Sequence, residues 1–362
     1  MDTMSKSTKM IRSRRCGLRN MGNTCYVNTA IQCIANVNEL SDYLCSEDNS
    51  SNYLGDINRD VNESRITFEF SNLLKKMFTT DRPIVPDSFI ERLSEFNKHS
   101  THQFKFVLGR QHDIQEFLIF LLDVIHISIQ EEVTIEFKGK PKNKTDDLLL
   151  DSYKSWKRSI EKEYSTMIEL FSGQYLLEIY SDTPDNKLLS MNFDRFNYLS
   201  LEITGNSIYD CLDNHCAFER LNGDNQYEYE NGDIKVKMDA KKRFTFWKLP
   251  KYLIVSFKRF KFHHTGRKIN DHIDFPINNL DMSPYASGLA TGNSSYRLIS
   301  IANHMGGSGG GHYFAITRTP SSGSKWVLYN DRSVVDIDYD DMDELKSKIV
   351  TKNAYLLIYE KY

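Results

Sequence analysis

The spacing of apolar residues changes once along this chain, near Gly173. Before that glycine, apolar residues recur every three or four positions, which is typical of amphipathic helices. The clearest stretches are FEFSNLLKKMF (68–78), DSFIERLSEF (87–96), HDIQEFLIFLLDVIHISI (112–129) and SWKRSIEKEYSTMIELF (155–171). After it come short runs typical of strands: QYLLEIY (174–180), RFTFWKLP (243–250), YLIVSFKRF (252–260), YRLISIA (296–302), HYFAIT (312–317), KWVLYN (325–330) and AYLLIYE (354–360). Helices followed by strands, rather than alternating with them, predict an α+β architecture.

Composition excludes several classes of protein. Hydrophobic residues make up 40% and charged residues 26% of the 362 residues, which is ordinary for a globular protein. A net charge of −3 provides no field that would attract nucleic acid or an anionic bilayer. No apolar run approaches the roughly 18 residues of a membrane helix, and the first fifteen residues lack the apolar centre of a secretion signal. We therefore expect no nucleic-acid partner and no membrane association.

Two details of composition concern the cellular compartment. Five of the first fifteen residues are Lys or Arg, which indicates a flexible basic tail over residues 1–15 or a nuclear address. The six cysteines are sparse and irregularly spaced, as expected for free thiols in a reducing compartment. We expect a protein of the cytosol, the nucleus or both.

A cysteine lies at the start of one predicted helix. NMGNTCYVNTAIQC (20–33) places Cys25 after a polar turn. Asn23 or Thr24 can cap the helix, and the unpaired N–H groups and the dipole of its first turn favour a thiolate. A cysteine in this position is either a nucleophile or a small buried apolar residue, and the segment alone leaves both interpretations open.

HMGGSGGGHYFAIT (304–317) carries five glycines ahead of His312. Such glycines let a loop shift, or let an extended peptide pass close to the backbone. His312, at the start of a predicted strand, can accept a proton from a thiol, as Cys/His catalysis requires. Both His312 and His304 can equally be strand histidines bonded to a neighbouring hydroxyl group.

A catalytic imidazole needs a partner on its second ring nitrogen. KWVLYNDRSV (325–334) places Asn330 and Asp331 at the end of the next strand, where antiparallel pairing brings them toward His312. Asn-Asp at a strand end is also a common turn. Asn330 would orient the ring without adding charge, whereas Asp331 would also stabilise an imidazolium, and the sequence does not choose between them.

Asp113 and Glu116 precede a long apolar helix, at the spacing of a capping box. A capping carboxylate can also face a cationic ligand. The polar, lysine-rich stretch over 131–150 predicts a linker or insertion.

These stretches, in this order, resemble the signature boxes of the ubiquitin-specific proteases, which are papain-like cysteine proteases that remove ubiquitin from proteins. The boxes are GLRNMGNTCYVNTAIQCI, GRQHDIQEFLIFLL, LPKYLIVSFKRF, and HMGGSGGGHYFAITR followed by WVLYNDRSV. The resemblance runs from about Gly17 to Tyr359. It implies an α+β papain-like fold in one catalytic domain over residues 16–362, with a helical thumb (about 16–130), an insertion (about 131–150), and β fingers and palm (about 165–362).

The resemblance also implies roles for individual residues. The catalytic ones are Cys25 as nucleophile, His312 as general base, Asn330 as the third member, Asp331 as its companion, and Asn20 as the oxyanion donor together with the backbone N–H of Cys25. A preorganised hydrogen bond to an oxyanion is commonly worth ~3 kcal/mol of barrier. Asp113 is expected to hold an arginine of ubiquitin's C-terminal tail, for which the glycine-rich loop moves aside. The other expected substrate-binding residues are Gly310, Gly311, Tyr313 and His304.

One departure from the family concerns metal. Many members bind structural zinc through two Cys-x-x-Cys pairs in the fingers, expected here near IYSDTPD (179–185) and NQYEYENGD (225–233), and neither stretch contains a cysteine. Cys211 and Cys216 have neither the spacing nor the number for a four-thiolate site. We expect fingers without metal, held by cross-strand pairs such as those available from Tyr175, Ile179, Tyr227 and Tyr229, and no cofactor. His112 occupies a position where the family more commonly has Gln.

The resemblance thus implies a monomeric thiol isopeptidase that cleaves the bond between the C-terminal glycine of ubiquitin and a lysine or peptide. Its partners would be ubiquitin and ubiquitinated proteins. Two alternatives stay open: the same chemistry directed at a ubiquitin-like modifier, and an inactive ubiquitin-binding module. The presence of Cys25, His312, Asn330 and Asn20 favours an enzyme over the inactive module.

Overall fold

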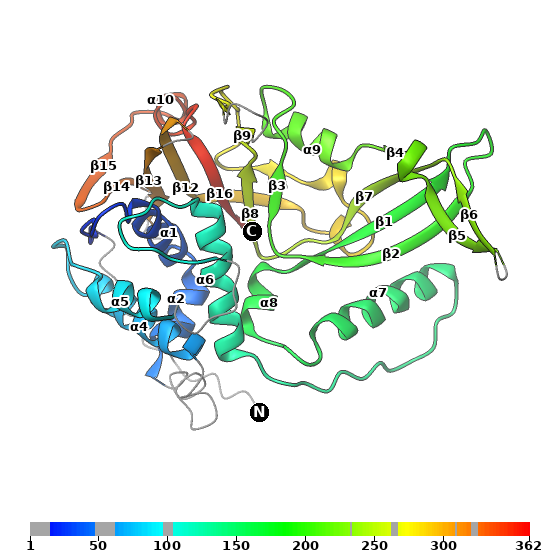
Figure 1. Ribbon diagram of the computed structural model, residues 1–362, viewed down its shortest axis with the longest axis horizontal. Coiled ribbons are helices and arrows are strands. Elements are labelled where there is room, and N and C mark those ends of the chain that lie inside the picture. Colours follow the sequence, from blue (N-terminus) through cyan, green and yellow to red (C-terminus); the bar gives the residue numbers. More distant parts are fainter. Residues whose placement is uncertain are drawn as a thin grey trace. The chain divides into compact units, whose positions relative to one another are not determined.

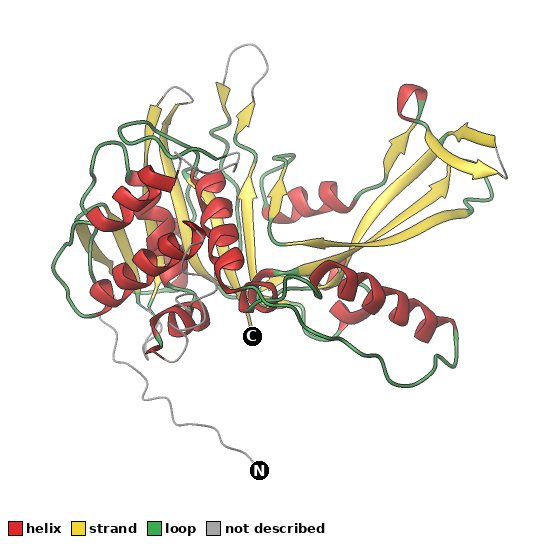
Figure 2. Cartoon of the chain, turned by 60° about the horizontal axis from the view of Figure 1, so that its bottom comes forward, coloured by secondary structure: helices red, strands yellow, loops and turns green. Residues whose placement is uncertain are grey.

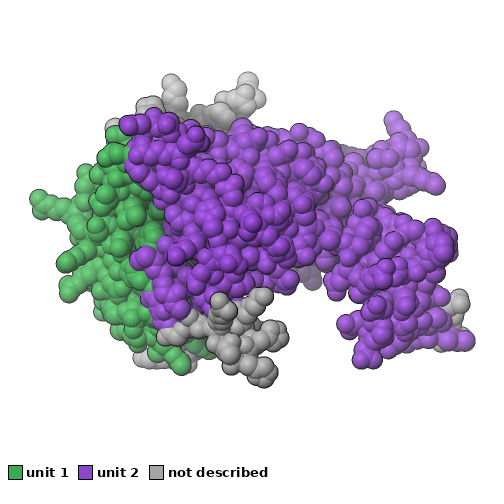
Figure 3. Space-filling model, turned by 90° about the horizontal axis from the view of Figure 1, so that it is seen from above, with its two compact units in different colours: residues 1–128, 312–338 green, residues 129–311, 339–362 purple. Residues whose placement is uncertain are grey.

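The computed structural model describes residues 15–47, 62–96, 104–231, 234–261, 267–307, 310–319 and 325–362. The chain forms two compact units, which Figure 3 distinguishes by colour. Unit 1 comprises residues 1–128 and 312–338, and unit 2 comprises residues 129–311 and 339–362. Each unit is therefore built from two segments that are far apart in the sequence. Residues 1–14 of the predicted basic tail lie outside the described residues, and the predicted thumb, insertion and fingers boundaries stay predictions.

The first segment of unit 1 supplies its helices (Figures 1 and 2). They are α1 (Cys25–Ala35), α2 (Asn38–Cys45), α4 (Asn62–Phe78), α5 (Asp87–Phe96) and α6 (Ile114–Ile129). In α4 the apolar residues Ile66, Phe70 and Leu74 are fully buried, as their four-residue spacing predicts. In α1 every residue is buried, polar ones included. A helix buried on all sides must satisfy its polar side chains internally, and those of α1 build the candidate site described below.

The second segment of unit 1 forms an antiparallel meander of β13 (Gly310–Arg318), β14 (Trp326–Asn330) and β15 (Ser333–Ile337). Ala315 lies opposite Tyr329, and Asn330 lies opposite Ser333. The turn between β14 and β15 holds Asp331 at φ +51°, a left-handed conformation that Asp adopts more readily than most residues.

The residues before α1 lie directly against this turn. The backbone N–H of Leu18 donates to the carbonyl of Asp331 at 2.9 Å. A Cβ at Gly17 would lie 2.5 Å from the carbonyl oxygen of Arg332, so that only glycine fits there. The two segments of unit 1 are thereby joined next to Cys25.

One sheet of unit 2 has the strand order β2-β1-β7-β4, with all neighbours antiparallel. Its strands are β1 (Gly173–Ser181), β2 (Leu188–Phe196), β4 (Glu219–Leu221) and β7 (Ala240–Lys248). Tyr175 stacks on Phe196 with ring centroids 4.3 Å apart and contacts Phe246 at 5.1 Å, so that aromatic cross-strand pairs stabilise this sheet. A separate hairpin of β5 (Tyr227–Asn231) and β6 (Ile234–Met238) carries the stacked pair Tyr227 and Tyr229.

The helix predicted over 155–171 is wrong in extent. It is two helices, α7 (Lys144–Ile160) and α8 (Thr166–Phe171), and α7 begins inside the predicted insertion. The Asn143 side chain caps α7 by accepting from the backbone N–H of Asp146 at 2.9 Å. Between the helices, the backbones of Glu131 and Tyr164 exchange two hydrogen bonds, which takes the chain out of the helical path.

Four other strands of unit 2 are hydrogen-bonded neighbours in the order β12-β16-β8-β3, within a longer sheet. They are β3 (Leu199–Leu201), β8 (Tyr252–Phe257), β12 (Ser295–Gly307) and β16 (Ala354–Lys361), and β11 (Leu280–Asp281) pairs with β12. All six residues of β8 are buried, as expected of a continuous apolar run that is covered on both faces. The remaining elements of unit 2 are α9 (Ile208–Cys216), β9 (Phe260–Lys261), β10 (Arg267–Lys268), α10 (Met342–Ile349) and the short 3-10 turns Gly223–Asn225, Ser283–Tyr285 and Gly288–Thr291.

Most predicted elements are confirmed. The helices over 68–78, 87–96 and 112–129 are present, as are the strands predicted after Gly173. The short helices α9 and α10 were not predicted, because each lies in a polar stretch and is set by its cap: Ser207 and Asp210 form a capping box, and Asp341 accepts from Glu344 N–H. Among the described helices, none is long and apolar enough to span a bilayer.

Candidate active site

Cys25 is the first residue of α1. The predicted side-chain cap is wrong, because both candidate side chains have other partners. Thr24 Oγ1 accepts from the backbone N–H of Met21 at 2.9 Å, and Asn23 Nδ2 donates to the carbonyl of Gly109 at 2.7 Å. Asn23 and Thr24 therefore stabilise the loop that precedes the helix, and their side chains do not cap the helix.

The Cys25 thiol is buried, with 3% of the residue exposed. Burial raises the pKa of this thiol above its ordinary value, and the nearby Asp331 raises it further. Backbone N–H groups of Tyr313, of Tyr26 and of Cys25 itself lower the pKa, but burial outweighs them. The N-terminus of α1 thus provides the expected N–H groups, yet the resting site favours the neutral thiol.

His312 lies on β13, immediately before Tyr313, whose backbone N–H faces the Cys25 sulfur. Its Nε2 lies 2.6 Å from Asn330 Oδ1. An amide oxygen only accepts, so Nε2 carries the proton and Nδ1 keeps the lone pair that a thiol proton would need. Within the described residues no hydrogen bond joins the Cys25 sulfur to the imidazole, and such bonds are often long in free enzymes and tighten when substrate binds.

Asp331 has different partners from Asn330. Its Oδ2 accepts from Asn20 Nδ2 at 3.0 Å, and its Oδ1 accepts from Asn28 Nδ2 at 2.8 Å. The amide of Asn20 is fixed from its other end, because its Oδ1 accepts from the backbone N–H groups of Gly22 (3.0 Å) and Thr24 (3.1 Å). One Nδ2 hydrogen of Asn20 therefore points to Asp331, and the second is left for another acceptor.

Asn28 is a residue that the sequence reasoning missed. It is 2% exposed and follows Cys25 by almost one helical turn. Besides binding Asp331, its Nδ2 lies 3.2 Å from the carbonyl of Leu18. The available signal was the presence of a polar residue among the apolar residues of α1, since a buried amide requires partners. Gln32, one turn further on, is used differently, because its Nε2 donates to the carbonyl of Cys16 at 2.8 Å.

The N-terminus of α6 lies close to this group within unit 1. Asp113 Oδ1 accepts from the backbone N–H of Gln115 at 2.6 Å, which is a capping interaction. Tyr313 is buried, and its hydroxyl lies near Asp113 and the backbone N–H of Ile114. Capping and substrate binding are both compatible with this position of Asp113.

His112 packs against the neighbour of the nucleophile. Its ring centroid lies 5.5 Å from that of Tyr26, and its Nε2 accepts from the backbone N–H of Val107 at 3.4 Å. Burial, and then the charge of Arg110, lower the pKa of His112. The neutral imidazole of His112 thus accepts a hydrogen bond, as the amide oxygen of a glutamine can.

The other predicted substrate-binding residues lie in unit 2, where β12 ends and β13 begins. His304 is buried, with its ring 5.5 Å from that of Phe260. A Cβ at Gly311 would lie 2.2 Å from His304 Nε2, so the backbone packs directly on this ring. Gly310 is the exposed first residue of β13, and Gly309 lies outside the described residues. Substrate binding by His304, Gly310 and Gly311 stays a prediction.

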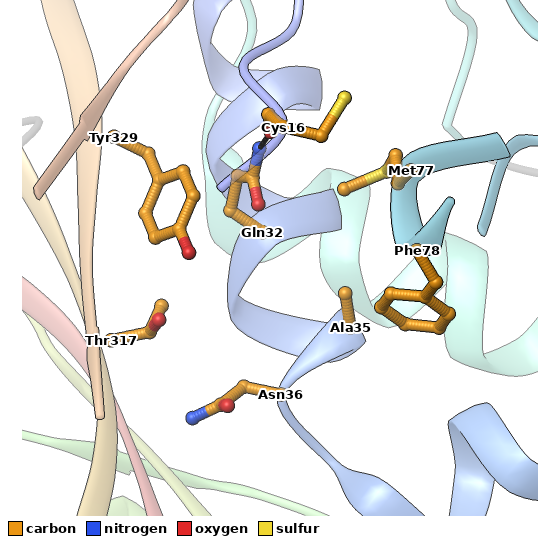
Figure 4. Close-up of a pocket in the computed structure, with 8 residues that line it drawn as sticks. All are labelled: Cys16, Gln32, Ala35, Asn36, Met77, Phe78, Thr317 and Tyr329. Atoms are coloured by element: carbon orange, nitrogen blue, oxygen red, sulfur yellow. Dashed lines mark hydrogen bonds between the residues drawn. The ribbon is translucent and has the colours of Figure 1, made fainter. Parts of the chain in front are cut away.

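A small cavity lies beside α1, and its lining side chains come from α1 and its C-cap, the end of α4, β13, β14 and Cys16 (Figure 4). Its volume is about 20 Å³, which is the size of one water molecule and far too small for a substrate. The lining residues are Cys16, Gln32, Ala35, Asn36, Met77, Phe78, Thr317 and Tyr329. Burial raises the pKa of the Cys16 thiol to about 11, which makes Cys16 a poor nucleophile.

Among the residues that the structure describes, no group of three or more His, Cys, Asp and Glu side chains could hold a metal ion. Cys211 and Cys216 are free thiols on α9, and His215 Nε2 lies 2.9 Å from the Tyr175 hydroxyl. The absence of zinc from the fingers stays a prediction.

A helix that begins with a cysteine, placed beside an antiparallel meander that carries a histidine, is the arrangement of the papain-like cysteine proteases. The predicted fold is confirmed by a structure of yeast SAGA DUBm with an Sgf73 mutant, which superposes with a TM-score of 0.71 at 24% identity over 98% of this chain and 70% of that chain. The family model described as ubiquitin carboxyl-terminal hydrolase matches residues 16–359. The chain therefore belongs to the ubiquitin carboxyl-terminal hydrolase family, within which its relatives are ubiquitin-specific proteases.

Curated relatives agree with this assignment. Ubiquitin carboxyl-terminal hydrolase Usp2 of Drosophila melanogaster is 32% identical over 96% of this chain, which is 35% of that protein. Ubiquitin carboxyl-terminal hydrolase 2 of Homo sapiens is 32% identical over 95% of this chain and 54% of that protein. A probable ubiquitin carboxyl-terminal hydrolase of Acanthamoeba polyphaga mimivirus is 26% identical over 99% of this chain and 92% of that protein. The chain thus spans between about a third and about half of the first two relatives.

Proposed function

We propose that the chain is a deubiquitinating thiol isopeptidase with Cys25 as its nucleophile. The observation that carries this proposal is the hydrogen bond of 2.6 Å between His312 Nε2 and Asn330 Oδ1. His312 lies on β13, and the backbone N–H of the next residue, Tyr313, faces the Cys25 sulfur. That bond leaves His312 Nδ1 as the proton acceptor. The family assignment supports ubiquitin as the substrate.

Acylation follows from these positions. The Cys25 sulfur attacks the carbonyl carbon of the C-terminal glycine of ubiquitin, and its proton passes to His312 Nδ1. The oxyanion accepts from the free Nδ2 hydrogen of Asn20 and from the backbone N–H of Cys25. The C–N bond then breaks, His312 returns the proton to the lysine amine, and a thioester remains.

In deacylation, water is the nucleophile and the Cys25 sulfur is the leaving group. His312 Nδ1 takes a proton from water, whose oxygen attacks the thioester carbonyl beside the same oxyanion donors. The C–S bond breaks, ubiquitin leaves with a free carboxylate, and the Cys25 thiol is restored. Because the resting thiol is neutral, substrate binding must also align it with His312 before attack.

The test is incubation with ubiquitin that carries a thiol-reactive electrophile at its C-terminus. The wild-type chain should gain the mass of one ubiquitin, Cys25→Ala should gain none, and Cys33→Ala, which removes a buried thiol of the same helix, should react like the wild type. An adduct that survives Cys25→Ala contradicts the assignment of the nucleophile. Reaction only with a ubiquitin-like modifier would show that this modifier, rather than ubiquitin, is the substrate. Binding without any adduct would indicate the inactive ubiquitin-binding module.

The proposal includes ubiquitinated proteins as partners, action as a monomer, and residence in the cytosol or nucleus. The six cysteines of the chain are free thiols, which supports a reducing compartment.

A further inference from the structure

Unit 2 contains a cavity of about 380 Å³ that the proposed reaction does not use. It lies between α7, the start of β1, the ends of β7 and β16, and the 3-10 turn at Gly288–Thr291. Its lining residues are Tyr153, Trp156, Gln174, Lys248, Leu249, Leu289 and Lys361. The volume is within the range of small-molecule sites in proteins.

The charged groups of this lining are both cationic. Within the described residues, neither the Lys248 nor the Lys361 ammonium forms an ion pair. The negative charge of Glu169 raises the pKa of Lys248, although the two side chains do not form an ion pair. Burial lowers the pKa of both lysines, and the charge of Lys361 adds to the effect at Lys248. Two ammonium groups that line one cavity, neither of them held in an ion pair, favour an anionic ligand.

The rest of the lining is largely aromatic and aliphatic. The Lys248 Nζ lies 3.7 Å from the centroid of the Trp156 ring, which is a cation–π contact between two residues of the lining. Tyr153 and Leu289 are each 40% exposed at its rim, whereas Leu249 is buried. Gln174 is 2% exposed and is held by a bond of 3.1 Å from its Nε2 to the carbonyl of Ser152. These surfaces suit a flat apolar group next to the charge.

We propose that this cavity binds a small aromatic anion, a single ring that carries a phosphate or carboxylate group. The anion would lie between the Lys248 and Lys361 ammonium groups, and the ring would pack against Tyr153 and the two leucines. The proposal is independent of the catalytic assignment, because none of the lining residues belongs to the group around Cys25.

Calorimetric titration with phenyl phosphate tests the proposal, with inorganic phosphate and phenol as separate probes. Phenyl phosphate should bind with one-site stoichiometry and more tightly than either probe, since each contains only half of the recognised chemistry. Lys248→Gln and Lys361→Gln should each weaken binding about tenfold or more, as expected on losing a charge-assisted hydrogen bond. Lys251→Gln, an exposed lysine of the same unit outside the lining, is the matched control and should bind like the wild type.

Thermal melting establishes that each variant is folded. If Lys248→Gln melts early because its contact with Trp156 is lost, Lys361→Gln decides the outcome. No saturable binding of phenyl phosphate, or an equal loss in Lys251→Gln, would overturn the site. Inorganic phosphate that binds as tightly as phenyl phosphate would overturn the aromatic part.

Discussion

At the end of β14, Asn330 accepts from His312, while the carboxylate one residue later accepts from Asn20 and Asn28. In the proposed reaction, the first side chain orients the general base and the second fixes the oxyanion donor. The sequence left open which of the two is the partner of His312. The hydrogen bonds separate them, because Asn330 accepts from His312 whereas both carboxylate oxygens of Asp331 accept from the amides of Asn20 and Asn28.

We therefore expect Asn28 to act on catalysis through Asp331. In Asn28→Ala, one oxygen of Asp331 loses its donor and the position of Asn20 becomes less defined, so kcat should fall by about tenfold or more while KM changes little. Steady-state kinetics on a ubiquitin C-terminal fluorogenic substrate measures both constants. The double variant Asn28→Ala, Asp331→Ala should lose little more than Asp331→Ala alone, because the residues act as one unit.

Gln32→Ala is the matched control for this prediction. It removes another buried amide of α1, whose partner is Cys16 rather than Asp331. It should lower the melting temperature while kcat is kept. Equal losses of kcat in the two single variants would show that Asn28 matters only for the stability of α1.

The Cys25 thiol provides a second prediction at this scale. Because burial raises its pKa, the rate of alkylation by iodoacetamide in the free protein should still rise with pH beyond about 8.5, the usual thiol pKa. Site-resolved mass spectrometry follows Cys25 separately from Cys16, whose pKa of about 11 should keep it slower still. A plateau in the Cys25 rate below neutral pH would show a resting thiolate and contradict this structure of the site.

Where β12 ends and β13 begins, the structure gives a different reason for the glycines from the reason that the sequence suggested. The sequence suggested room for a passing peptide. In the structure, Gly306 has φ +107°, and a Cβ on it would lie 2.7 Å from Gly311 Cα. These glycines are required because two backbones and the His304 ring occupy the space of their side chains.

Gly311→Ala should therefore destabilise the protein by roughly 1–3 kcal/mol, the usual cost of forcing extra volume into packed structure. Gly307→Ala is the control, because a Cβ there meets nothing within 4 Å. Chemical denaturation of both variants measures the difference in the free energy of unfolding. If both are equally stable, the close approach at Gly311 does not constrain the residue type.

The elements that could be predicted are those whose apolar pattern is long or sharply bounded. The strand YLIVSF and the helix DSFIERLSEF were found because burial alone determines them. The start of α7 and the break before α8 could not be found in this way, since they depend on one cap at Asn143 and on backbone bonds between Glu131 and Tyr164. For the site, the ordered boxes predicted Cys25, His312 and Asn330 as catalytic residues, whereas Asn28 became visible only when α1 was placed against the β14–β15 turn.

For the whole molecule, Lys268 predicts how stability depends on pH. It is 5% exposed, donates to the carbonyl of His304 at 2.6 Å, and has a pKa lowered to about 8 by burial and then by the charges of Arg259 and Lys352. Between about pH 8 and the unfolded value near 10.4, the unfolded chain binds more protons at this lysine. Its contribution to the free energy of unfolding therefore rises with pH over that range.

Comparison with Lys268→Met isolates this contribution, since tyrosines and cysteines titrate in both proteins. The free energy of unfolding of the wild type, relative to that of Lys268→Met, should rise between about pH 7 and about pH 10. Urea denaturation at the two pH values measures it. A difference between the proteins that does not depend on pH would show that Lys268 has an ordinary pKa.

Metal provides the other prediction at this scale. With no cysteine in either stretch where the family's zinc ligands are expected, chelation should leave both the melting temperature and the turnover of ubiquitin unchanged. Elemental analysis of the purified protein checks the same point. Stoichiometric zinc, or unfolding after its removal, would show that other ligands such as Cys211, His215 and Cys216 had been recruited.

The hydrogen bond between Asn20 and Asp331 joins residues that are 311 positions apart. During synthesis on a ribosome, at about 5–20 residues per second, the second partner is made tens of seconds after the first. Until residue 312 is made, the emerging chain contains Cys25 but neither His312 nor Asn330, and by that point residues 129–311 of unit 2 have been made. In the proposed reaction, the nascent protein therefore carries its thiol without a base or a fixed oxyanion donor, and it cannot act on ubiquitin until residue 331 has been translated.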